Sequence, residues 1–324
     1  MAETLAERLA QLSPEKRRLL LDRLRRDAAE PSRPVAVPRD GGPLPLSFAQ
    51  ERLWFLWRLA PQSAAYNAPV ALRLRGALDA AALQEAVSAV VARHEVLRTR
   101  YAEGADGPVQ VIDPHCAVPL PLVDVPAGDE RECEKALRAL VTEAAEEPFD
   151  LATGPVLRCR LFRAAPQDHV LLLVMHHIAC DGWSLPILWH EVAQVYRSAA
   201  GAGAADKSQL PEFPELPELP ELPLQYADFA SWQRKQSADG EYAAQLDYWE
   251  RQLAAVPALE LPADRARPAA PSFAGGRVEV RVAPRVAAEL RRLAGSCDAT
   301  MFMVLLAAFQ VLLGRVSGCL LYTS

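Results

Sequence analysis

Two adjacent histidines follow an apolar run, and an aspartate and a glycine come shortly after them. The run covers residues 170–175, the histidines are His176 and His177, and three residues separate them from Asp181 and Gly182. An imidazole titrates near neutral pH, which suits transfer of a proton from an attacking amine or hydroxyl. Because adjacent strand residues point to opposite faces, we expect one histidine to enter a cleft and the other to turn inward, held by backbone contacts.

The residues after the histidines suit a braced loop, although other interpretations stay open. We expect Asp181 to neutralise a nearby cation and brace the loop, and Gly182 to permit a turn or a close backbone approach. The segment could also be an ordinary strand end with two core histidines. A metal site that includes Cys180 lacks HExxH spacing and a second ligand cluster, so no metal is predicted. The sequence has no GxSxG motif of a serine hydrolase, and Gly201–Gly203 lacks the strand and helix of a nucleotide-binding loop.

The elements that must position this loop alternate between strands and helices. Residues 157–161 alternate apolar side chains with arginines, and a hairpin at 165–168 leads to residues 169–175, whose nearly continuous apolar character predicts a strand covered on both faces. Residues 70–74 alternate in the same way. Asp79 is expected to cap a helix whose buried side carries Leu83, Ala86, Val87 and Val90. This pattern predicts a layered α/β architecture.

Composition shifts divide the chain into five segments. We expect a helical leader at 1–27, a linker at 28–45, a first lobe with the two histidines at 46–200, a proline-rich connector at 201–224 and part of a second lobe at 225–324. Three elements of the second lobe are predicted: a long aromatic-rich helical stretch at 225–253, a strand at 277–282 and an apolar helix at 300–313.

Bulk composition narrows the class of protein. The chain has 324 residues and a net charge of −6, which gives no sign of nucleic-acid binding. The longest apolar stretch, residues 301–313, is too short to span a bilayer, and the charged start lacks the apolar segment of a secretory signal. The six cysteines form no CxxC pair. We therefore expect a cytoplasmic protein with free thiols and no membrane association.

Four segments resemble the condensation domains of nonribosomal peptide synthetases. The sequence HHIACDG at 176–182 is similar to the HHxxxDG signature that these domains share with the chloramphenicol acetyltransferase superfamily. Residues 46–56, LSFAQERLWFL, resemble the first condensation motif, SxAQxRLWxL. Residues 93–101, RHEVLRTRY, resemble the second motif, RHExLRTxF, and residues 226–232, YADFASW, resemble the fourth, YxDYAxW. The four segments occur in the family's order, and the leader also resembles a helical segment that often precedes such domains.

The resemblance implies both a fold and a reaction. The fold is an α/β (α+β two-layer) lobe like chloramphenicol acetyltransferase, with a mixed sheet and flanking helices, plus the start of a second similar lobe. The reaction joins a carrier-bound acyl or peptidyl thioester to the free amine of a carrier-bound aminoacyl group. The implied partners are the upstream and downstream peptidyl carrier proteins and an adjacent adenylation domain. The substrates ride on phosphopantetheine arms, and no cofactor is bound directly.

The resemblance also implies roles for individual residues. His177 orients or deprotonates the amine, His176 and Asp181 are structural, and Gly182 shapes the loop beside the developing oxyanion. Arg52 is expected near this loop, paired with Asp181. The other motif residues are expected to be structural: Phe48, Leu53, Trp54 and Leu56 as core packing, Arg98 and Arg100 as a solvated strand face, and Tyr226, Phe229 and Trp232 as helix packing.

The resemblance also bears on the type of substrate and on the end of the chain, and it leaves alternative functions open. The segment MHHIxxDGWS at 175–184, together with SFAQERLWFL and Tyr66-Asn67, is most similar to condensation domains that join an L-configured donor to an L-amino acid. The residues after Ser317 do not resemble what should follow in the family, so we expect a truncated and poorly active chain whose helix at 301–313 exposes its apolar face. The alternatives are an acyltransferase with a small free acceptor, an epimerising relative and an inactive docking module.

Overall fold

The structure is a computed structural model that describes residues 33–105, 107–203, 219–256, 259–266, 276 and 278–318. The helical leader expected at 1–27 lies outside the described residues. Contacts divide the chain into two units. The described residues up to 62 and those of 67–235 form the first unit, and residues 63–66 with the described residues after 235 form the second.

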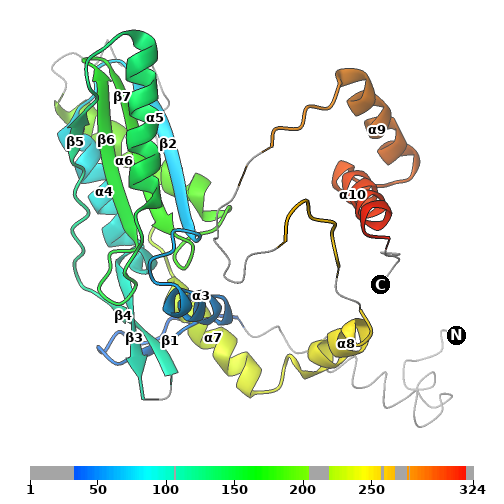
Figure 1. The fold of residues 1–324 in the computed structure, drawn as a ribbon. Coiled ribbons are helices and arrows are strands. Elements are labelled where there is room, and N and C mark those ends of the chain that lie inside the picture. The colour runs from blue at the N-terminus through cyan, green and yellow to red at the C-terminus, as the bar shows by residue number, and fades with distance from the viewer. Residues whose placement is uncertain are drawn as a thin grey trace, which may run out of the picture. The chain divides into compact units, whose positions relative to one another are not determined.

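A four-stranded mixed sheet is the framework of the first unit (Figure 1). Its strand order is β2 (Asn67–Arg75), β7 (Asp168–His176), β6 (Leu157–Ala165) and β5 (Leu122–Asp124). β7 pairs antiparallel with both neighbours, whereas β5 runs parallel to β6. The predicted α/β class, the three predicted strands and the hairpin between β6 and β7 are confirmed.

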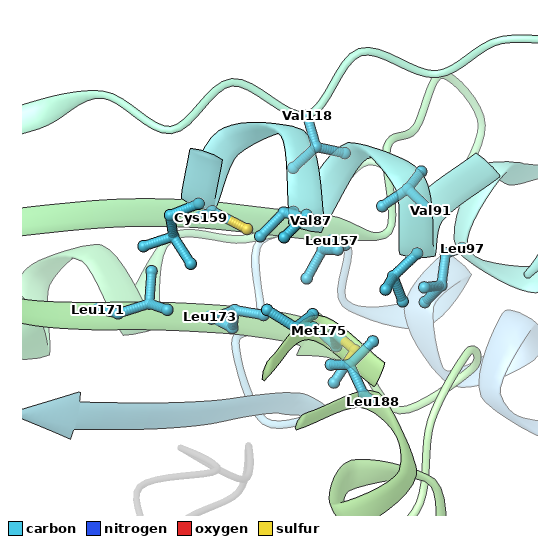
Figure 2. Packing of buried hydrophobic residues seen from close by; sticks show 14 of the residues in the cluster. Val87, Val91, Leu97, Val118, Leu157, Cys159, Leu171, Leu173, Met175 and Leu188 are labelled. Atoms are coloured by element: carbon cyan, nitrogen blue, oxygen red, sulfur yellow. The ribbon is translucent and has the colours of Figure 1, made fainter. Parts of the chain in front are cut away.

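Both faces of β7 are covered, which accounts for its continuous apolar sequence. Leu171, Leu173 and Met175 pack in one core cluster with α4 (Ala80–Arg93) and α6 (Ser184–Gly203), as Figure 2 shows for part of this cluster. The alternate residues of β7 pack in a second cluster with α3 (Phe48–Leu59) and α5 (Glu130–Glu146). Helices therefore lie on both faces of the sheet, and the lobe has three layers rather than the two expected, because a strand without polar alternation needs cover on each side.

A small second sheet and the chain before it adjoin this framework. The sheet has the order β1 (Leu44–Pro45), β4 (Gly107–Ile112) and β3 (Thr99–Gly104), and the short 3-10 helix η1 (Glu95–Arg98) precedes β3. The expected linker at 28–45 is described from residue 33 onward, and this part is not free. β1 ends it, and the backbone N–H of Val37 and the guanidinium of Arg39 both bind the carboxylate of Asp228 at 2.9 Å. Hydrogen bonds to a buried carboxylate thus hold its second half against the first unit.

Helix α4 forms as its sequence predicts. The carboxylate of Asp79 accepts hydrogen bonds from the backbone N–H groups of Ala81 and Ala82, which have no partner within the helix. The four predicted core positions of this helix are all buried, and Ala82 and Val91 are buried with them. The apolar spacing therefore identified the face that packs on the sheet.

The long helical stretch expected at 225–253 is two helices. α7 (Tyr226–Ala238) and α8 (Ala243–Leu253) are separated by a turn in which Gly240 has φ +78°, a left-handed conformation that ends helices. The division between the units falls after Lys235, later than the connector expected at 201–224. The reason is that α7 binds residues at the start of α3, and α6 continues to Gly203.

The second unit consists mainly of helices. Besides α8, it contains α9 (Pro284–Ser296) and the predicted apolar helix α10 (Met301–Ser317), whose first turn is capped by the hydroxyl of Thr300. The strand expected at 277–282 is wrong for the residues described there. Residues 278–283 are irregular, and Val278 and Val280 are more than 80% exposed, because no strand of this unit pairs with them among the described residues.

No single helix in the described part of the chain is both long and apolar enough to cross a membrane. Helices α9 and α10, bent by 107° at their junction, have the necessary length and composition only as a pair. No group of three or more histidine, cysteine, aspartate or glutamate residues in the same part is arranged to hold a metal ion.

Candidate functional site

His176 is the last residue of β7 and faces inward. Its side chain is 3% exposed, its backbone N–H donates to the carbonyl of Val156, and its Nδ1 accepts a hydrogen bond of 3.1 Å from the N–H of Ile178. Burial lowers the pKa of His176 to about 4, with a smaller contribution from the neighbouring His177. His176 is therefore a neutral, structurally held imidazole at pH 7.

His177 lies on the opposite side and is exposed, as the alternation of a strand requires. Its Nδ1 is 3.1 Å from the carbonyl oxygen of Cys180. Because a carbonyl oxygen only accepts, Nδ1 carries the hydrogen in this contact and Nε2 keeps its lone pair. For the neutral imidazole, the loop thus selects the tautomer with the hydrogen on Nδ1, whose Nε2 can accept a proton.

Asp181 braces the loop through the start of α6. One carboxylate oxygen accepts hydrogen bonds from the N–H of Trp183 at 3.0 Å, the N–H of Ser184 at 2.8 Å and the hydroxyl of Ser184 at 2.9 Å. The bonds from Ser184 are the main reason why the pKa of Asp181 lies below its usual value. No role was expected for Ser184, although an aspartate three residues before a serine at a helix start is typical of a cap.

The expected pair between Arg52 and Asp181 is not formed. Arg52 lies exposed on α3, and no ion pair joins these two described residues. One oxygen of the Asp181 carboxylate instead accepts from the loop's own donors. In the same turn of α3, it is Glu51 that forms an ion pair, with Arg234 of α7. A role for Arg52 near the loop stays a prediction.

Gly182 borders open space. A Cβ atom built at this position has no atom within 4 Å, and its φ lies outside the left-handed region. The expectation that Gly182 permits a close backbone approach is therefore not met by any neighbouring protein atom. Together, His177, Asp181 and Gly182 form the exposed surface of one loop.

The thiol of Cys180 takes no part in this surface. Cys180 is buried, and its Sγ lies 3.6 Å from the carbonyl of His176. Burial raises the pKa of Cys180 to about 12, so the thiol stays protonated at neutral pH and is a poor nucleophile there.

The first and fourth motif segments bind each other. The hydroxyls of Ser47 and Tyr226 are 2.9 Å apart, and the N–H of Phe48 donates to the side chain of Gln233. Phe48 is 41% exposed beneath the guanidinium of Arg234, so its expected core position is wrong, whereas Trp54 is buried as expected. These segments are structural contacts between α3 and α7.

The second motif segment anchors α6. Glu191 of α6 is buried, and its two carboxylate oxygens bind Nε2 of His94 at 2.5 Å and Nε of Arg93 at 3.3 Å. Arg98, expected on a solvated face, is largely buried and donates to the carbonyls of Ala92 and Asp113. The helix that begins at the candidate loop is thereby tied to the end of α4.

Two cavities of the first unit lie away from the histidine loop. A cavity of about 490 Å³ is lined by α6, the end of α4 and residues 219–222, and one of about 210 Å³ lies between Trp57 and Phe149. Neither is lined by His177 or Asp181. The candidate site in this structure is an exposed loop rather than the wall of either cavity.

Comparison with known proteins identifies a family and several relatives. The family model described as "Condensation domain" matches residues 42–319. Chondramide synthase cmdD of Chondromyces crocatus is 42% identical over 275 residues, which are 85% of this chain and 7% of that protein. Phosphinothricin tripeptide synthetase PhsC of Streptomyces viridochromogenes is 40% identical over 321 residues, 98% of this chain and 28% of that protein. The chain thus spans a small part of these relatives.

Solved structures share the fold. The X-domain in a complex with OxyB from teicoplanin biosynthesis is 35% identical, with a TM-score of 0.74 over 90% of this chain and 61% of that chain. The first condensation domain of the CDA synthetase has a TM-score of 0.62 at 22% identity, over 86% of this chain and 63% of that chain. The second likeness concerns the fold alone.

Proposed function

The chain belongs to the condensation domain family, and on that premise we propose that it forms an amide bond between two substrates held on separate carrier proteins. The donor is an acyl or peptidyl thioester, and the acceptor is an aminoacyl thioester with a free α-amine. The observation that carries this proposal is the exposed imidazole of His177, whose Nδ1–H is bound to the carbonyl of Cys180 while Nε2 is left basic.

The chemical step needs little beyond position and one proton transfer. The amine nitrogen attacks the carbonyl carbon of the donor thioester, the C–S bond breaks, and the donor arm leaves as a thiolate. The proton that the amine loses passes to Nε2 of His177 and from there to the thiolate, so that an amide and a thiol result. Because a thioester is already activated, alignment of the two reactants supplies most of the acceleration.

The neighbouring residues support this role without taking part in the bond changes. Neutral His176 holds the end of β7, and Asp181 caps the turn into α6 through the donors of Trp183 and Ser184. Gly182 leaves the space beside the loop open. We assign this open space to the thioester carbonyl, with the backbone near Gly182 facing the oxygen on which negative charge develops.

The partners in this proposal are proteins of an assembly line. The donor and acceptor arrive on phosphopantetheine arms of the upstream and downstream peptidyl carrier proteins, and an adenylation domain lies next to the chain in the full synthetase. The large synthetases that match the chain at about 40% identity support this setting. An L-configured donor and an L-amino acid acceptor are the proposed substrates.

A docking role is the second candidate. It is favoured by the 35% identity to an X-domain whose solved structure is a complex with OxyB. In this alternative, the fold presents a surface to another protein of the same biosynthesis, and His177 does not act chemically.

The test is a condensation assay with loaded donor and acceptor carrier proteins. Mass spectrometry of the intact acceptor carrier protein measures the amide product attached to it. We expect His177→Ala to reduce the rate of amide formation about 10²- to 10⁴-fold. His190→Ala, which changes another exposed histidine on α6, is the matched control and should leave the rate unchanged. Equal rates for wild type and His177→Ala would refute the catalytic role and favour docking. Amide formation with a small free amine, without an acceptor carrier, would favour an acyltransferase of another kind.

A further inference from the structure

A cation–aromatic contact lies behind the histidine loop. The guanidinium of Arg158, on β6, is 3.9 Å from the centroid of the Phe149 ring. Phe149 is 3% exposed, and its ring meets the ring of His176 edge-on, with centroids 6.0 Å apart and an interplanar angle of 81°. Arg158, Phe149 and His176 thus form a continuous row of planar groups that runs from the partly exposed Arg158 to the buried His176.

Arg158 also fixes the backbone on which Phe149 stands. It donates to the carbonyl of Pro148 at 2.7 Å and to the carbonyl of Glu147, and its buried Nε has no hydrogen-bond partner. On that side, the carboxylate of Glu147 lies 3.8 Å from Nε, beyond hydrogen-bond distance, and the face of the Phe149 ring adds a second favourable contact. A planar fork that binds two carbonyls while covering a ring is geometry that lysine cannot reproduce.

Phe149 is held from the other side by α3. The indole N–H of Trp57 donates to the carbonyl of Phe149 at 2.9 Å. Asn67 of β2, the register partner of His176, binds the nearby carbonyls of Ala145 and Glu147 at 2.7 and 2.8 Å. The segment 145–149 is thus tied to three elements of the first unit, and its one aromatic side chain is aimed at His176.

The row ends where the candidate catalytic loop begins. The carbonyl of His176 accepts from the N–H of Ala179, and Nδ1 of the same residue accepts from Ile178. The turn that places the carbonyl of Cys180 under His177 therefore folds around the His176 ring. A rotation of that ring would move the acceptor that selects the tautomer of His177.

We propose that Phe149 and Arg158 are positioning residues, which lock the ring of His176 and through it the tautomer and direction of the His177 imidazole. This inference rests on the proposed function for its catalytic consequence, but the locking itself is a property of the free chain. Neither residue touches the reacting atoms.

The chain offers matched controls for both residues. Phe162 is 1% exposed in the same core cluster, but it pairs with Val170, six residues along β7 from His176. Arg163 lies on β6 five residues from Arg158 and binds the carboxylate of Asp124 at 2.9 Å, so it shares no ion-pair partner with Arg158. Phe162→Leu and Arg163→Lys therefore reproduce the chemical change at residues outside the row.

The first measurement is the ¹⁵N NMR spectrum of the histidine side chains, of which the chain has six. We expect Phe149→Leu and Arg158→Lys to shift the ring nitrogen signals of His176 and His177 from a single tautomer toward a mixture, and both controls to leave them in place. Unchanged signals in Phe149→Leu and Arg158→Lys would overturn the proposal. Arg158→Lys keeps the charge and most of the packing, so it stays informative if Phe149→Leu fails to fold.

The second measurement is the condensation rate at saturating loaded carrier proteins. We expect Phe149→Leu to lower the maximal rate roughly 10- to 100-fold, with little change in the half-saturating concentration of the acceptor carrier, because only alignment is affected. Equal losses in Phe149→Leu and Phe162→Leu would overturn the positioning role. A wild-type chain that forms no amide, but whose histidine signals respond as expected, would refute the proposed function and leave the locking of the ring established.

Discussion

Two segments of the molecule, β7 in the first unit and α10 in the second, are both strongly apolar in sequence but differ in how far they are buried. The residues of β7 from Val170 to Met175 are at most 7% exposed, whereas Phe302, Met303 and Phe309 of α10 are 54–72% exposed. Each element forms as its own sequence predicts. The difference shows that an apolar pattern determines the element, while burial depends on partners from elsewhere in the chain. The candidate catalytic loop stands on the segment that has such partners on both faces.

The largest expected effect is the loss of a core side chain from β7. Leu172→Ala should lower the free energy of unfolding of the first unit by about 2–5 kcal/mol, because the removed atoms leave a cavity between packed layers. Leu312→Ala in α10, a side chain that is largely exposed, should change it by less than about 0.5 kcal/mol. Urea unfolding followed by tryptophan fluorescence measures both. Equal costs would remove the contrast between the two segments.

The next effect is the pH dependence that His176 brings to the first unit. Its pKa in the folded chain is about 4, below the ordinary value of 6.5, so the unfolded chain binds the extra proton first. The stabilisation is complete above pH 6.5 and is lost as the pH falls from 6.5 toward 4, by up to about 3 kcal/mol. Urea unfolding at pH 7 and pH 5 should show the decrease in the wild type.

The control for this pH effect is a histidine outside the core. His176→Asn should reduce the difference in the free energy of unfolding between pH 7 and pH 5, whereas His190→Asn, which changes an exposed residue of α6, should keep it. A pH dependence that is unaffected by His176→Asn would show that this imidazole binds its proton equally well in the folded and the unfolded chain.

Removing the N-terminal caps of helices α4 and α10 should have a smaller effect on stability, which differs between the two helices. Asp79 caps α4 with two hydrogen bonds, and Thr300 caps α10 with one of 3.2 Å. Asp79→Ala should cost the first unit about 1 kcal/mol, because α4 packs on the sheet and its fraying disturbs the core. Thr300→Ala should reduce helical circular dichroism without moving the unfolding midpoint of the first unit. A shift of that midpoint by Thr300→Ala would show that the two units unfold together.

The smallest effect on stability is expected at the exposed face of α10. Replacing Phe302 and Phe309 by glutamate should change the free energy of unfolding by less than about 0.5 kcal/mol but should reduce self-association of the chain. Sedimentation velocity at several concentrations measures the association. Leu59→Glu is the control, because Leu59 is as exposed but lies on α3 in the first unit. Unchanged association in the double variant would show that this face does not make the chain self-associate.

Much of the first unit could be predicted from local patterns. The continuous apolar residues of β7, the alternation in β6 and the cap and spacing of α4 each correspond to the element that forms. The strand expected at 277–282 was wrong, although Val278 and Val280 alternate with polar residues, because alternation has no effect without a neighbouring strand to bind. The single long helix expected after residue 225 was divided by the turn at Gly240.

Some features of the candidate site could also be predicted from the sequence, and others could not. Strand alternation predicted that one histidine would turn inward and the other enter a cleft, and the spacing of Asp181 predicted a braced loop. His176 is buried as expected, whereas His177 lies on an exposed loop that lines neither of the two cavities. The expected pair of Asp181 with Arg52 was wrong, and Ser184 and the backbone beside it bind one oxygen of the carboxylate instead. Phe149 and Arg158 carry no motif in the sequence analysis. They became candidates only through their distances from each other and from His176.

The sequence by itself determined the chemistry available to this protein, which is a pair of histidines at the end of an apolar strand and a capped loop before a helix. Those features depend on residue types and on spacings of a few residues. Only the tertiary structure decided how deeply each imidazole is buried and which nitrogen of His177 keeps a lone pair in the neutral ring. It also decided that Phe149 contacts both Arg158 and His176. These properties depend on burial and on hydrogen bonds between residues far apart in the chain, and such pairings have no local signature.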